Sequence, residues 1–444
     1  MKTRICQLAA LVLMGGASVA AQTVDDTQLK FVILFGRHGV RTPNSPNSVL
    51  NNFAVQPFPV FPDVPGNPTD NSPSILTPNG AANETLLGGY FRLWLTQQGL
   101  LTGNDTVDAA NVYFHADAAP LIINTAQALA AGLLPSAKVT VNSVSKPPDP
   151  LFDPVDAGVA LLDQRKTVAA VNGRLGNDPQ AMASAYSAEL ALIRSVLFNY
   201  PVSQTPAPAT PVGKIDVTSV PMTVGTGNSQ LPVSLGGLTT VALAIDPFVM
   251  EYADGLPVSQ VAWGQLTESQ ISQVFRVYDR LLDLEFRTPY MATEQTSNLA
   301  SHIVRTLVQA ATGDAMSGTL ASPSTRIISL TASNFNIAGL SGLFHLDWLL
   351  PGYQPDVAAP GGVLMFQLRQ SQTTGEYVVR LAYVSQTMDQ LRNQTPLTLA
   401  APPPSAPVAI PGCSLGDANL DCPLGQFVRI ANEVISAHAA DLVY

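Results

Sequence analysis

The chain has 444 residues, of which 32 are acidic and 22 basic, so its formal net charge is −10 and its isoelectric point is near 4.9. This balance excludes a typical nucleic-acid binder, because such proteins gather Lys and Arg to neutralise phosphates. Charged residues make up only 12% of the chain, whereas the hydrophobic share of 46% is ordinary. With 36 Pro and 32 Gly dispersed among apolar runs, the composition predicts a folded, loop-rich protein with a large core.

Residues 1–21 have the pattern of a secretory signal peptide. Two basic residues precede a short apolar stretch, and small residues follow up to Ala21, after which we expect cleavage. The stretch is too short to span a bilayer, which takes about 20 apolar residues, and no later segment is long and apolar enough. We therefore expect an exported protein, periplasmic or released into the medium, that is soluble and free of the membrane after cleavage. Its two remaining cysteines, Cys413 and Cys422, are expected to form one disulfide that closes a short loop.

Apolar runs of strand length alternate with helical patterns along the chain. The predicted strands are 29–35, 111–114, 326–330, 362–368 and 377–384, the last two as an antiparallel pair. The predicted helices, with apolar residues three and four positions apart, are 125–133, 180–197, 268–286 and 296–311. This alternation predicts an α/β fold with a mostly parallel sheet and helices on both faces.

The middle of the chain differs in composition. Between 143 and 266 it is rich in Pro, Thr and Ser with helical stretches, and we interpret it as a smaller helix-rich domain. That domain would be inserted into a large α/β domain formed by 22–142 and 267–444. The Pro-rich segment 395–411 is expected to be extended.

The string RHGVRTP at 37–43 directly follows the first predicted strand. In open α/β sheets, ligands bind outside the carboxyl ends of the strands, so this loop stands where a site is expected. Two guanidiniums beside an imidazole suit a phosphoryl group, because one Arg side chain can donate to two phosphate oxygens at once and stays charged. A neutral imidazole can attack phosphorus and give a phosphohistidine that water later hydrolyses. We therefore predict His38 as nucleophile, with Arg37, Arg41 and Thr42 binding phosphate.

Together with weaker strings, this motif resembles the histidine acid phosphatase family, in its bacterial phytase and glucose-phosphatase branch. The family signature RHGxRxP is matched at 37–43, and supporting strings run through nearly the whole mature chain: ALAAGLLP at 128–135, FVMEYADGLP at 248–257, NIAGL at 336–340 and PGG at 360–362. The resemblance implies a large α/β domain, a small helical domain and a cleft between them. It also implies acid hydrolysis of a small phosphorylated substrate through a phosphohistidine, without a metal or another cofactor.

Three positions depart from the family pattern. The family's third phosphate-binding Arg falls at Leu121, and its late His-Asp pair falls at Ser333 and Asn334. Leu121 cannot donate a hydrogen bond, and Asn334 lacks a readily transferable proton. Because general acid catalysis is worth about 10² to 10⁴ in rate, we expect alkyl phosphates to be poor substrates and aryl or acyl phosphates to react more easily.

Substitutes for the lost groups lie elsewhere in the sequence. His115 and Asp117 follow the second predicted strand, and Glu251 lies in FVMEYADGLP; for each, a structural role is an ordinary alternative. His345 and Asp347 follow the changed pair, and we interpret them as structural. Three functions stay open: a histidine-type phosphatase without its usual acid, a phosphate-ester-binding homologue without turnover, and a different reaction on the same scaffold. We favour the first because the whole RHGVRTP string is present.

Overall fold

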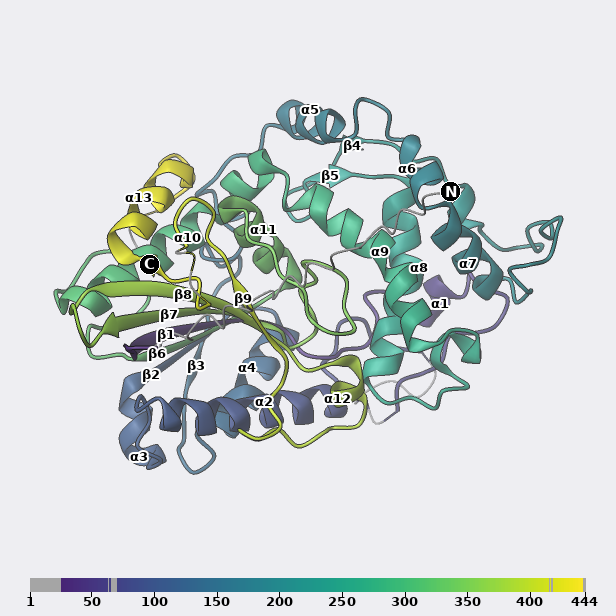
Figure 1. Cartoon of the computed structure of the whole chain (residues 1–444). Coiled ribbons are helices and arrows are strands. Elements are labelled where there is room, and N and C mark those ends of the chain that lie inside the picture. Colours follow the sequence, from purple (N-terminus) through teal and green to yellow (C-terminus); the bar gives the residue numbers. More distant parts are fainter. Residues whose placement is uncertain (1–24, 63, 65–69, 415, 417, 442–444) are drawn as a thin grey trace, which may run out of the picture.

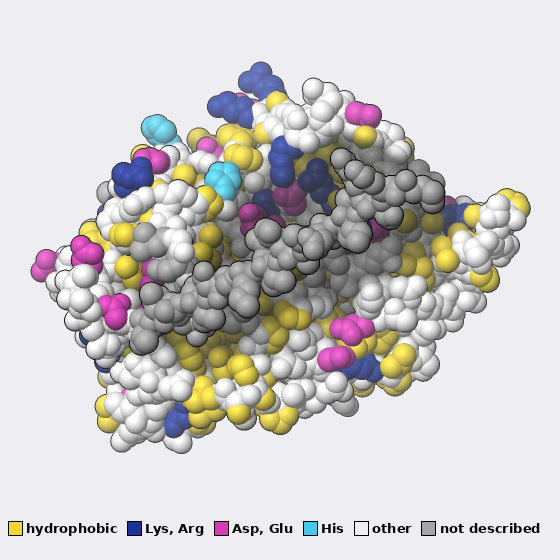
Figure 2. All heavy atoms as spheres, in the orientation of Figure 1, with side chains coloured by type: hydrophobic (Ala, Val, Ile, Leu, Met, Phe, Trp, Pro, Cys, Tyr) yellow, Lys and Arg dark blue, Asp and Glu magenta, His cyan; other side chains and the backbone are white. Residues whose placement is uncertain are grey.

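The computed structural model describes residues 25–62, 64, 70–414, 416 and 418–441. The predicted signal peptide and its cleavage site lie outside these residues. Within the described ranges, no helix combines the length and apolar character needed to cross a membrane. On the face drawn in Figure 2, most side chains are uncharged, in keeping with the low share of charged residues in the sequence.

An eight-stranded mixed sheet lies at the centre of one lobe (Figure 1), in the order β10-β8-β7-β1-β6-β2-β3 with β9 paired to β8. Its strands are β1 (Thr27–Arg37), β2 (Val112–Ala116), β3 (Val141–Asn142), β6 (Ile327–Ala332), β7 (Val363–Ser371), β8 (Tyr377–Val384), β9 (Ser405–Val408) and β10 (Cys422–Pro423). β1, β6, β2 and β3 run parallel, whereas β7 is antiparallel to both β1 and β8. The predicted α/β fold with a mostly parallel sheet is confirmed, as is the antiparallel pair 362–368 and 377–384.

Helices cover both faces of this sheet (Figure 1). On one face lie α2 (Pro78–Gln97) and α4 (Pro120–Leu133), and on the other α10 (Pro289–Thr312), α11 (Asn334–Phe344) and α13 (Leu424–Val434). β1 supplies side chains to both apolar layers: Phe31, Ile33 and Phe35 pack with α10 and α11, while Val32 and Leu34 pack with α2 and α4. Burial on both sides explains why β1 reads as a continuous apolar run and does not alternate.

Glycines allow α2 and α4 to touch backbone to backbone. A Cβ atom on Gly132 would lie 2.0 Å from the carbonyl oxygen of Thr85, and one on Gly88 would lie 2.1 Å from that of Leu129. Gly132 belongs to the string ALAAGLLP. Its place in that string therefore has a packing reason.

A second lobe is built mainly of helices around its own apolar core (Figure 1). Its elements are α5 (Gln164–Arg174), α6 (Ala181–Ala185), α7 (Ser187–Leu197), η2 (Val217–Ser219), β4 (Gly225–Thr226), β5 (Val233–Ser234), α8 (Gly237–Ala253), η3 (Val261–Gly264) and α9 (Glu268–Glu285). Its core also takes in Leu50, Phe53 and Phe58, which follow the RHGVRTP loop. The domain limits at 143 and 266 stay a prediction.

The remaining short elements are α1 (Asn47–Leu50), α3 (Asp105–Asp108), η1 (Ala109–Asn111) and α12 (Met388–Arg392). Most predicted elements are present, although α4 and α10 begin five and seven residues before the predicted starts at 125 and 296, and the single helix expected at 180–197 is wrong. It is divided into α6 and α7 at Tyr186, whose φ of −107° and ψ of 22° end the first helix. Nothing in the neighbouring side chains explains the break.

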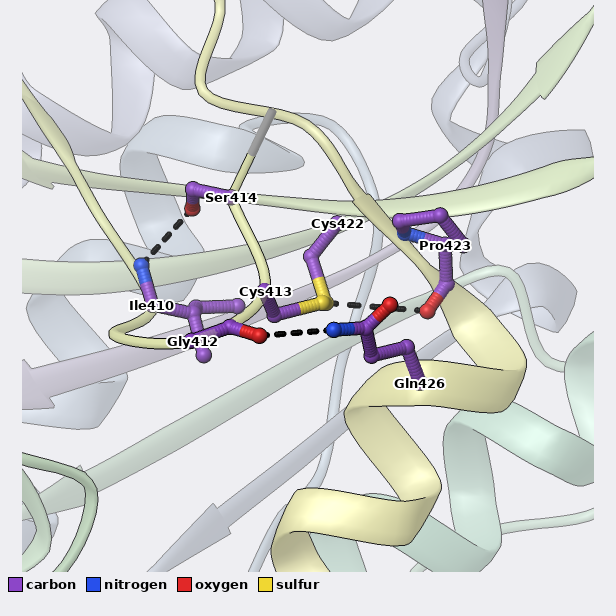
Figure 3. The surroundings of a disulfide bond; sticks show 7 residues. All are labelled: Ile410, Gly412, Cys413, Ser414, Cys422, Pro423 and Gln426. Carbon is purple, nitrogen blue, oxygen red and sulfur yellow. Dashed lines mark hydrogen bonds between the residues drawn. A yellow bond between two sulfur atoms is a disulfide. The ribbon is translucent and has the colours of Figure 1, made fainter. Parts of the chain in front are cut away.

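The predicted disulfide is present between Cys413 and Cys422, with their Cα atoms 5.2 Å apart (Figure 3). Cys422 begins β10, which pairs with β8. Beside the bridge, the side chain of Gln426 donates to the carbonyl oxygen of Gly412 over 2.6 Å. The bridge and this bond connect Gly412 and Cys413 to the edge of the sheet and to α13.

Candidate active site

Three neighbouring parallel strands, β1, β6 and β2, end at one edge of the sheet. The backbone N–H of His38, which follows β1, donates to the carbonyl of Ala332 in β6 over 2.9 Å. Asp117, which follows β2, donates in the same way to Thr331 of β6 over 3.0 Å. Residues 333–334 follow β6 itself. The strand order thus brings together three segments that the sequence singled out separately.

A cleft of about 660 Å³ opens at this edge. Its walls include these residues predicted for the site: His38, Arg41, Asp117, Leu121, Ser333 and Asn334. The same walls hold side chains that the sequence did not single out, among them Phe152, Asp153, Asp156, Phe286, Gln295 and Phe335. The rings of Phe286 and Phe335 stack with their centroids 4.5 Å apart and give the cleft an aromatic wall.

His38 is buried, and its Nδ1 lies 2.9 Å from the carbonyl oxygen of Gly39. A carbonyl oxygen can only accept, so the proton of the neutral ring is on Nδ1 and the lone pair is on Nε2. Burial, followed by the charges of Arg37 and Arg41, holds the pKa of His38 well below its usual value. The ring is therefore neutral over the mildly acid range, which is the form that a nucleophile requires.

Arg41 is fully buried and forms a bidentate ion pair with Asp246 of α8. The two bonds measure 3.0 Å from Nη1 to Oδ2 and 2.9 Å from Nη2 to Oδ1. Burial disfavours the cation, but the Asp246 carboxylate outweighs it and raises the pKa of Arg41. Arg41 is thus charged at every working pH, with much of its charge balanced inside the protein.

Arg37 occupies a different environment from Arg41. Its Nη1 donates to the carbonyl of Ala358 over 2.7 Å, while its Nε–H has no acceptor among the described residues. The guanidinium lines a separate cavity of about 30 Å³ that it shares with Asp279. Burial lowers the pKa of Arg37, although Arg stays protonated in proteins. The positive charge of Arg37 acts on His38 electrostatically and lowers the pKa of the imidazole.

Close packing and hydrogen bonds fix the conformation of the RHGVRTP loop. A Cβ atom on Gly39 would lie 2.9 Å from the Oε1 atom of Glu84, so only glycine fits there without displacing that buried side chain. The hydroxyl of Thr42 is fully buried, donates to the carbonyl of Ser72 and accepts from the N–H of Ile75. The described contacts of Thr42 therefore hold the loop in shape.

The three residues that depart from the family pattern lie at the starts of two helices, α4 and α11. Leu121 lies in the first turn of α4, and residues 118–122 line the cleft, so the positive dipole end of this helix is at the cleft wall. Ser333 caps α11, and its Oγ accepts from the N–H of Phe335 over 3.1 Å. Asn334 is buried and donates to the hydroxyl of Tyr278 over 3.4 Å.

The candidate substitutes are placed differently from one another. The Nε2 of His115 lies 2.7 Å from the Oδ2 of Asp149 in a buried pair. Glu251 is buried in the helical lobe, where it accepts from the N–H of Ala262, and burial raises its pKa to about 8. Of these three candidates, only Asp117 is among the described residues that line the cleft.

His345 and Asp347 have local structural contacts. His345 ends α11 in a left-handed conformation, with φ of 53°. Asp347 is exposed and forms an ion pair with Arg287 over 2.7 Å. These contacts agree with the structural interpretation of both residues.

Acidic side chains outnumber basic ones among the lining residues of the cleft. Apart from His38, the charged residues in its walls are Arg41, already paired outside the lining, and Asp117, Asp153 and Asp156. Within the described ranges, no three His, Cys, Asp or Glu side chains are grouped as a metal site would need. A multiply charged anion would therefore meet few free cations here.

Two of the residues that shape this site were not predicted. Asp246 stands alone in the apolar run VALAIDPFVM, and a lone carboxylate in a buried helix must find a partner. That signal was available, although the identity of its partner was not. Asp153 lies in the Pro-rich run KPPDPLFDP, where no pattern separates it from an ordinary loop charge.

Comparison with known proteins agrees with this arrangement. The profile of the histidine phosphatase superfamily (branch 2) matches residues 28–200. Phytase AppA of Escherichia coli (strain K12) is 28% identical over 430 residues, which are 96% of either chain, and a glucose-1-phosphatase of Salmonella typhimurium is 27% identical over 96% of this chain and 97% of its own.

Solved structures extend the likeness to three dimensions. A Hafnia alvei phytase in complex with myo-inositol hexakis sulphate superposes with a TM-score of 0.81 at 30% identity, over 94% of this chain and all of the other. The phytase of Citrobacter braakii has a TM-score of 0.82 at 26% identity, over 94% and 99% of the two chains. The chain is therefore a member of the histidine phosphatase superfamily, in its second branch.

Proposed function

We propose that the protein is a phosphomonoesterase that works through a phosphohistidine at His38. The observation that carries this proposal is a buried, neutral imidazole whose Nδ1–H is bound by its own loop, in a cleft that Arg41 also lines. Phytases and glucose-1-phosphatases among the relatives support the reaction class.

In the first step, Nε2 of His38 attacks phosphorus and the bond to the leaving oxygen breaks. Arg41 offers its charge to the phosphoryl oxygens from within its pair with Asp246. Arg37 adds its positive charge near the imidazole from the separate cavity that it lines. The positive dipole end of α4 adds to the attraction of an anion where the side chain of Leu121 cannot. Water then hydrolyses the phosphohistidine and restores the neutral ring.

The walls of the cleft favour a monoester with little additional charge. Three aspartates line it against one paired arginine, whereas a relative of known structure binds a hexakis sulphate. Phe286 and Phe335 offer an apolar surface to the leaving group. The substrate class that fits is a phosphomonoester with a neutral, partly apolar or aryl leaving group.

The usual proton donor is missing from this proposed mechanism. Asn334 occupies the position that the family resemblance assigns to the acid, and its amide is engaged with Tyr278. Asn has no proton to give at working pH. Any help to the leaving group must come from another side chain of the cleft.

A phosphate-ester-binding protein without turnover is the alternative, and one observation favours it. Arg41 is bound by Asp246 at both of its terminal nitrogens, which weakens its pull on a transferring phosphoryl group. In this case esters would bind and persist.

A paired assay separates the two functions. Purified protein and the His38→Ala variant are given p-nitrophenyl phosphate and an alkyl phosphate at mildly acid pH. We expect aryl hydrolysis in the natural protein and none in His38→Ala, with both proteins folded. Binding of the ester without product, or equal product from both proteins, would refute the phosphatase.

Export, and an inserted helix-rich domain at about 143–266 to whose core α9 also contributes, complete the proposal. The absence of a membrane-spanning helix among the described residues is compatible with export. N-terminal sequencing of the secreted protein tests cleavage after Ala21. Limited proteolysis tests the domain limits, since linkers are cut before packed elements.

A further inference from the structure

We propose that Asp153 is the proton donor to the leaving-group oxygen, in place of the acid that the chain lacks at position 334. The proposal rests on the proposed phosphohistidine function of the same cleft. Asp153 lines that cleft together with His38 and Asn334. It reaches the cleft from the loop that follows β3, far in sequence from the changed pair.

The loop that carries Asp153 is fixed against the start of α11. The side chain of Asn336, in the first turn of α11, donates to the carbonyl oxygen of Phe152 over 2.7 Å. The ring of Phe152 is buried and stacks on Phe35 of β1, with centroids 6.5 Å apart. These contacts hold Asp153 next to residues 333–336, the segment where the family pattern places its acid.

The backbone on the other side of Asp153 is fixed as well. Its N–H donates to the carbonyl of Asp149 over 2.7 Å. The carboxylate of Asp149 accepts from the N–H of Leu151 and pairs with His115 of β2. The side chain of Asn298 in α10 donates to the carbonyl oxygen of Pro150, so the loop is bound to α10 as well as to β2. A donor must be held in place, and this loop meets that need.

Charges around Asp153 favour its protonated form. Burial is the largest effect, and the carboxylates of Asp117, Asp156 and Asp149 add to it, so the pKa of Asp153 is raised to about 7. His115 across the loop is committed to Asp149. At mildly acid pH Asp153 therefore carries a proton that it can give away, as a general acid must.

Asp117 is less suited to the same task. Burial raises the pKa of Asp117 as well, but its Oδ1 accepts from the N–H of Ala118 over 2.6 Å, a bond that favours the ionised form and opposes this rise. No hydrogen bond from a described residue reaches the carboxyl group of Asp153, which leaves its proton free for a substrate. Asp117 thus acts on Asp153 through its charge, as one carboxylate that keeps its neighbour protonated.

Atoms and electrons balance in both steps. As the bond from Nε2 of His38 to phosphorus forms, the electron pair of the breaking P–O bond goes to the leaving oxygen, which takes the proton of Asp153 and departs as an alcohol. In the second step, the Asp153 carboxylate accepts a proton from the attacking water, and phosphate leaves His38. Asp153 is then protonated again.

The test compares alkyl and aryl phosphates in Asp153→Asn, with Asp156→Asn as control. Asp156 is an exposed carboxylate of the same cleft, so the control makes the same Asp-to-Asn change there without removing the proposed donor. We expect Asp153→Asn to lower kcat/KM for alkyl esters by about 10² to 10⁴-fold and for p-nitrophenyl phosphate by less than about tenfold, because a good leaving group needs little protonation. At mildly acid pH, below the raised pKa of Asp153, Asp156→Asn should keep the alkyl-to-aryl ratio of the natural protein, and at higher pH it should only move the basic limb to lower pH.

The pH profile gives a second measure that a merely structural role would not change. The basic limb of kcat/KM for alkyl esters should disappear in Asp153→Asn and return in Asp153→Glu. In Asp117→Asn it should move to lower pH, because a negative neighbour is removed.

An unchanged alkyl-to-aryl ratio in folded Asp153→Asn, alongside loss of all activity in His38→Ala, would overturn this inference and leave the proposed function standing. If the natural protein hydrolyses no ester at all, the proposed function fails first and the donor with it.

Discussion

Replacing Asp246 by Asn should strengthen the binding of phosphate by Arg41 and lower the folding stability that the ion pair provides. Both partners are about 2% exposed, and the pair is bidentate at 2.9 and 3.0 Å. Removing one charge leaves the other buried and uncompensated, which costs about 3 to 5 kcal/mol of folding stability. The freed guanidinium still lines the cleft, where a phosphate ion can become its new partner.

The gain in binding follows from the same bonds. A charge-assisted hydrogen bond is worth about 1.5 to 3 kcal/mol, so inorganic phosphate should bind Asp246→Asn about 10- to 100-fold more tightly than the natural protein. Thermal unfolding at increasing phosphate concentration measures both effects. We expect a lower Tm without phosphate and a larger rise of Tm with it.

A matched control separates this effect from general loss of stability. Asp421 forms a comparable bidentate pair with Arg380 in the sheet, with bonds of 2.7 and 2.9 Å. Asp421→Asn should lower the Tm without changing the response to phosphate. If Asp246→Asn folds but binds phosphate no better than the natural protein, Arg41 does not face the ligand as described.

Three further predictions concern substrate charge, packing and pH. Inositol hexakisphosphate should be turned over with a lower kcat/KM than a sugar monophosphate, and a reversed order would contradict the charge argument for the cleft. Gly132→Ala should destabilise the protein by about 1 to 3 kcal/mol, because its Cβ would meet the Thr85 carbonyl; Gly89→Ala on the same helix pair meets no atom within 4 Å and should be neutral or slightly stabilising in urea unfolding. Burial raises the pKa of Glu251 from 4.5 to about 8. Raising the pH from 4.5 to about 8 should therefore reduce the free energy of unfolding by roughly 1.4 kcal/mol for each pH unit, whereas Glu251 should have no effect on stability below pH 4.5. Glu251→Gln should flatten that slope by one proton, and an unchanged slope would show that Glu251 ionises equally in the folded and unfolded chains.

Local sequence patterns were enough for five of the eight strands of the sheet, but not for the short β3, β9 and β10 or for every helix. β1, β6, β7 and β8 are short apolar runs, and burial on both faces makes such runs easy to recognise. α8 is buried nearly all round and contains Pro247, so it has no polar face to reveal its period.

The candidate site shows the same division between local and distant information. His38, Arg37 and Arg41 belong to one string after one strand, and the loop could be predicted from seven residues. The partner of Arg41, Asp246, is 205 positions away on a helix of the other lobe. Asp153 reaches the cleft through contacts with β1 and α11. Such pairings depend on the packing of the whole chain, which no local pattern contains.

The central claim is that His38 carries the phosphoryl group during turnover. Rapid acid-free quenching with p-nitrophenyl phosphate, followed by digestion and mass spectrometry, would place one phosphoryl group on the peptide that contains residues 37–43. We predict that this modification appears at His38 within the first turnover and is absent from His38→Ala. Steady hydrolysis with no phosphorylated His38 at any time, or modification at another residue, would contradict the account.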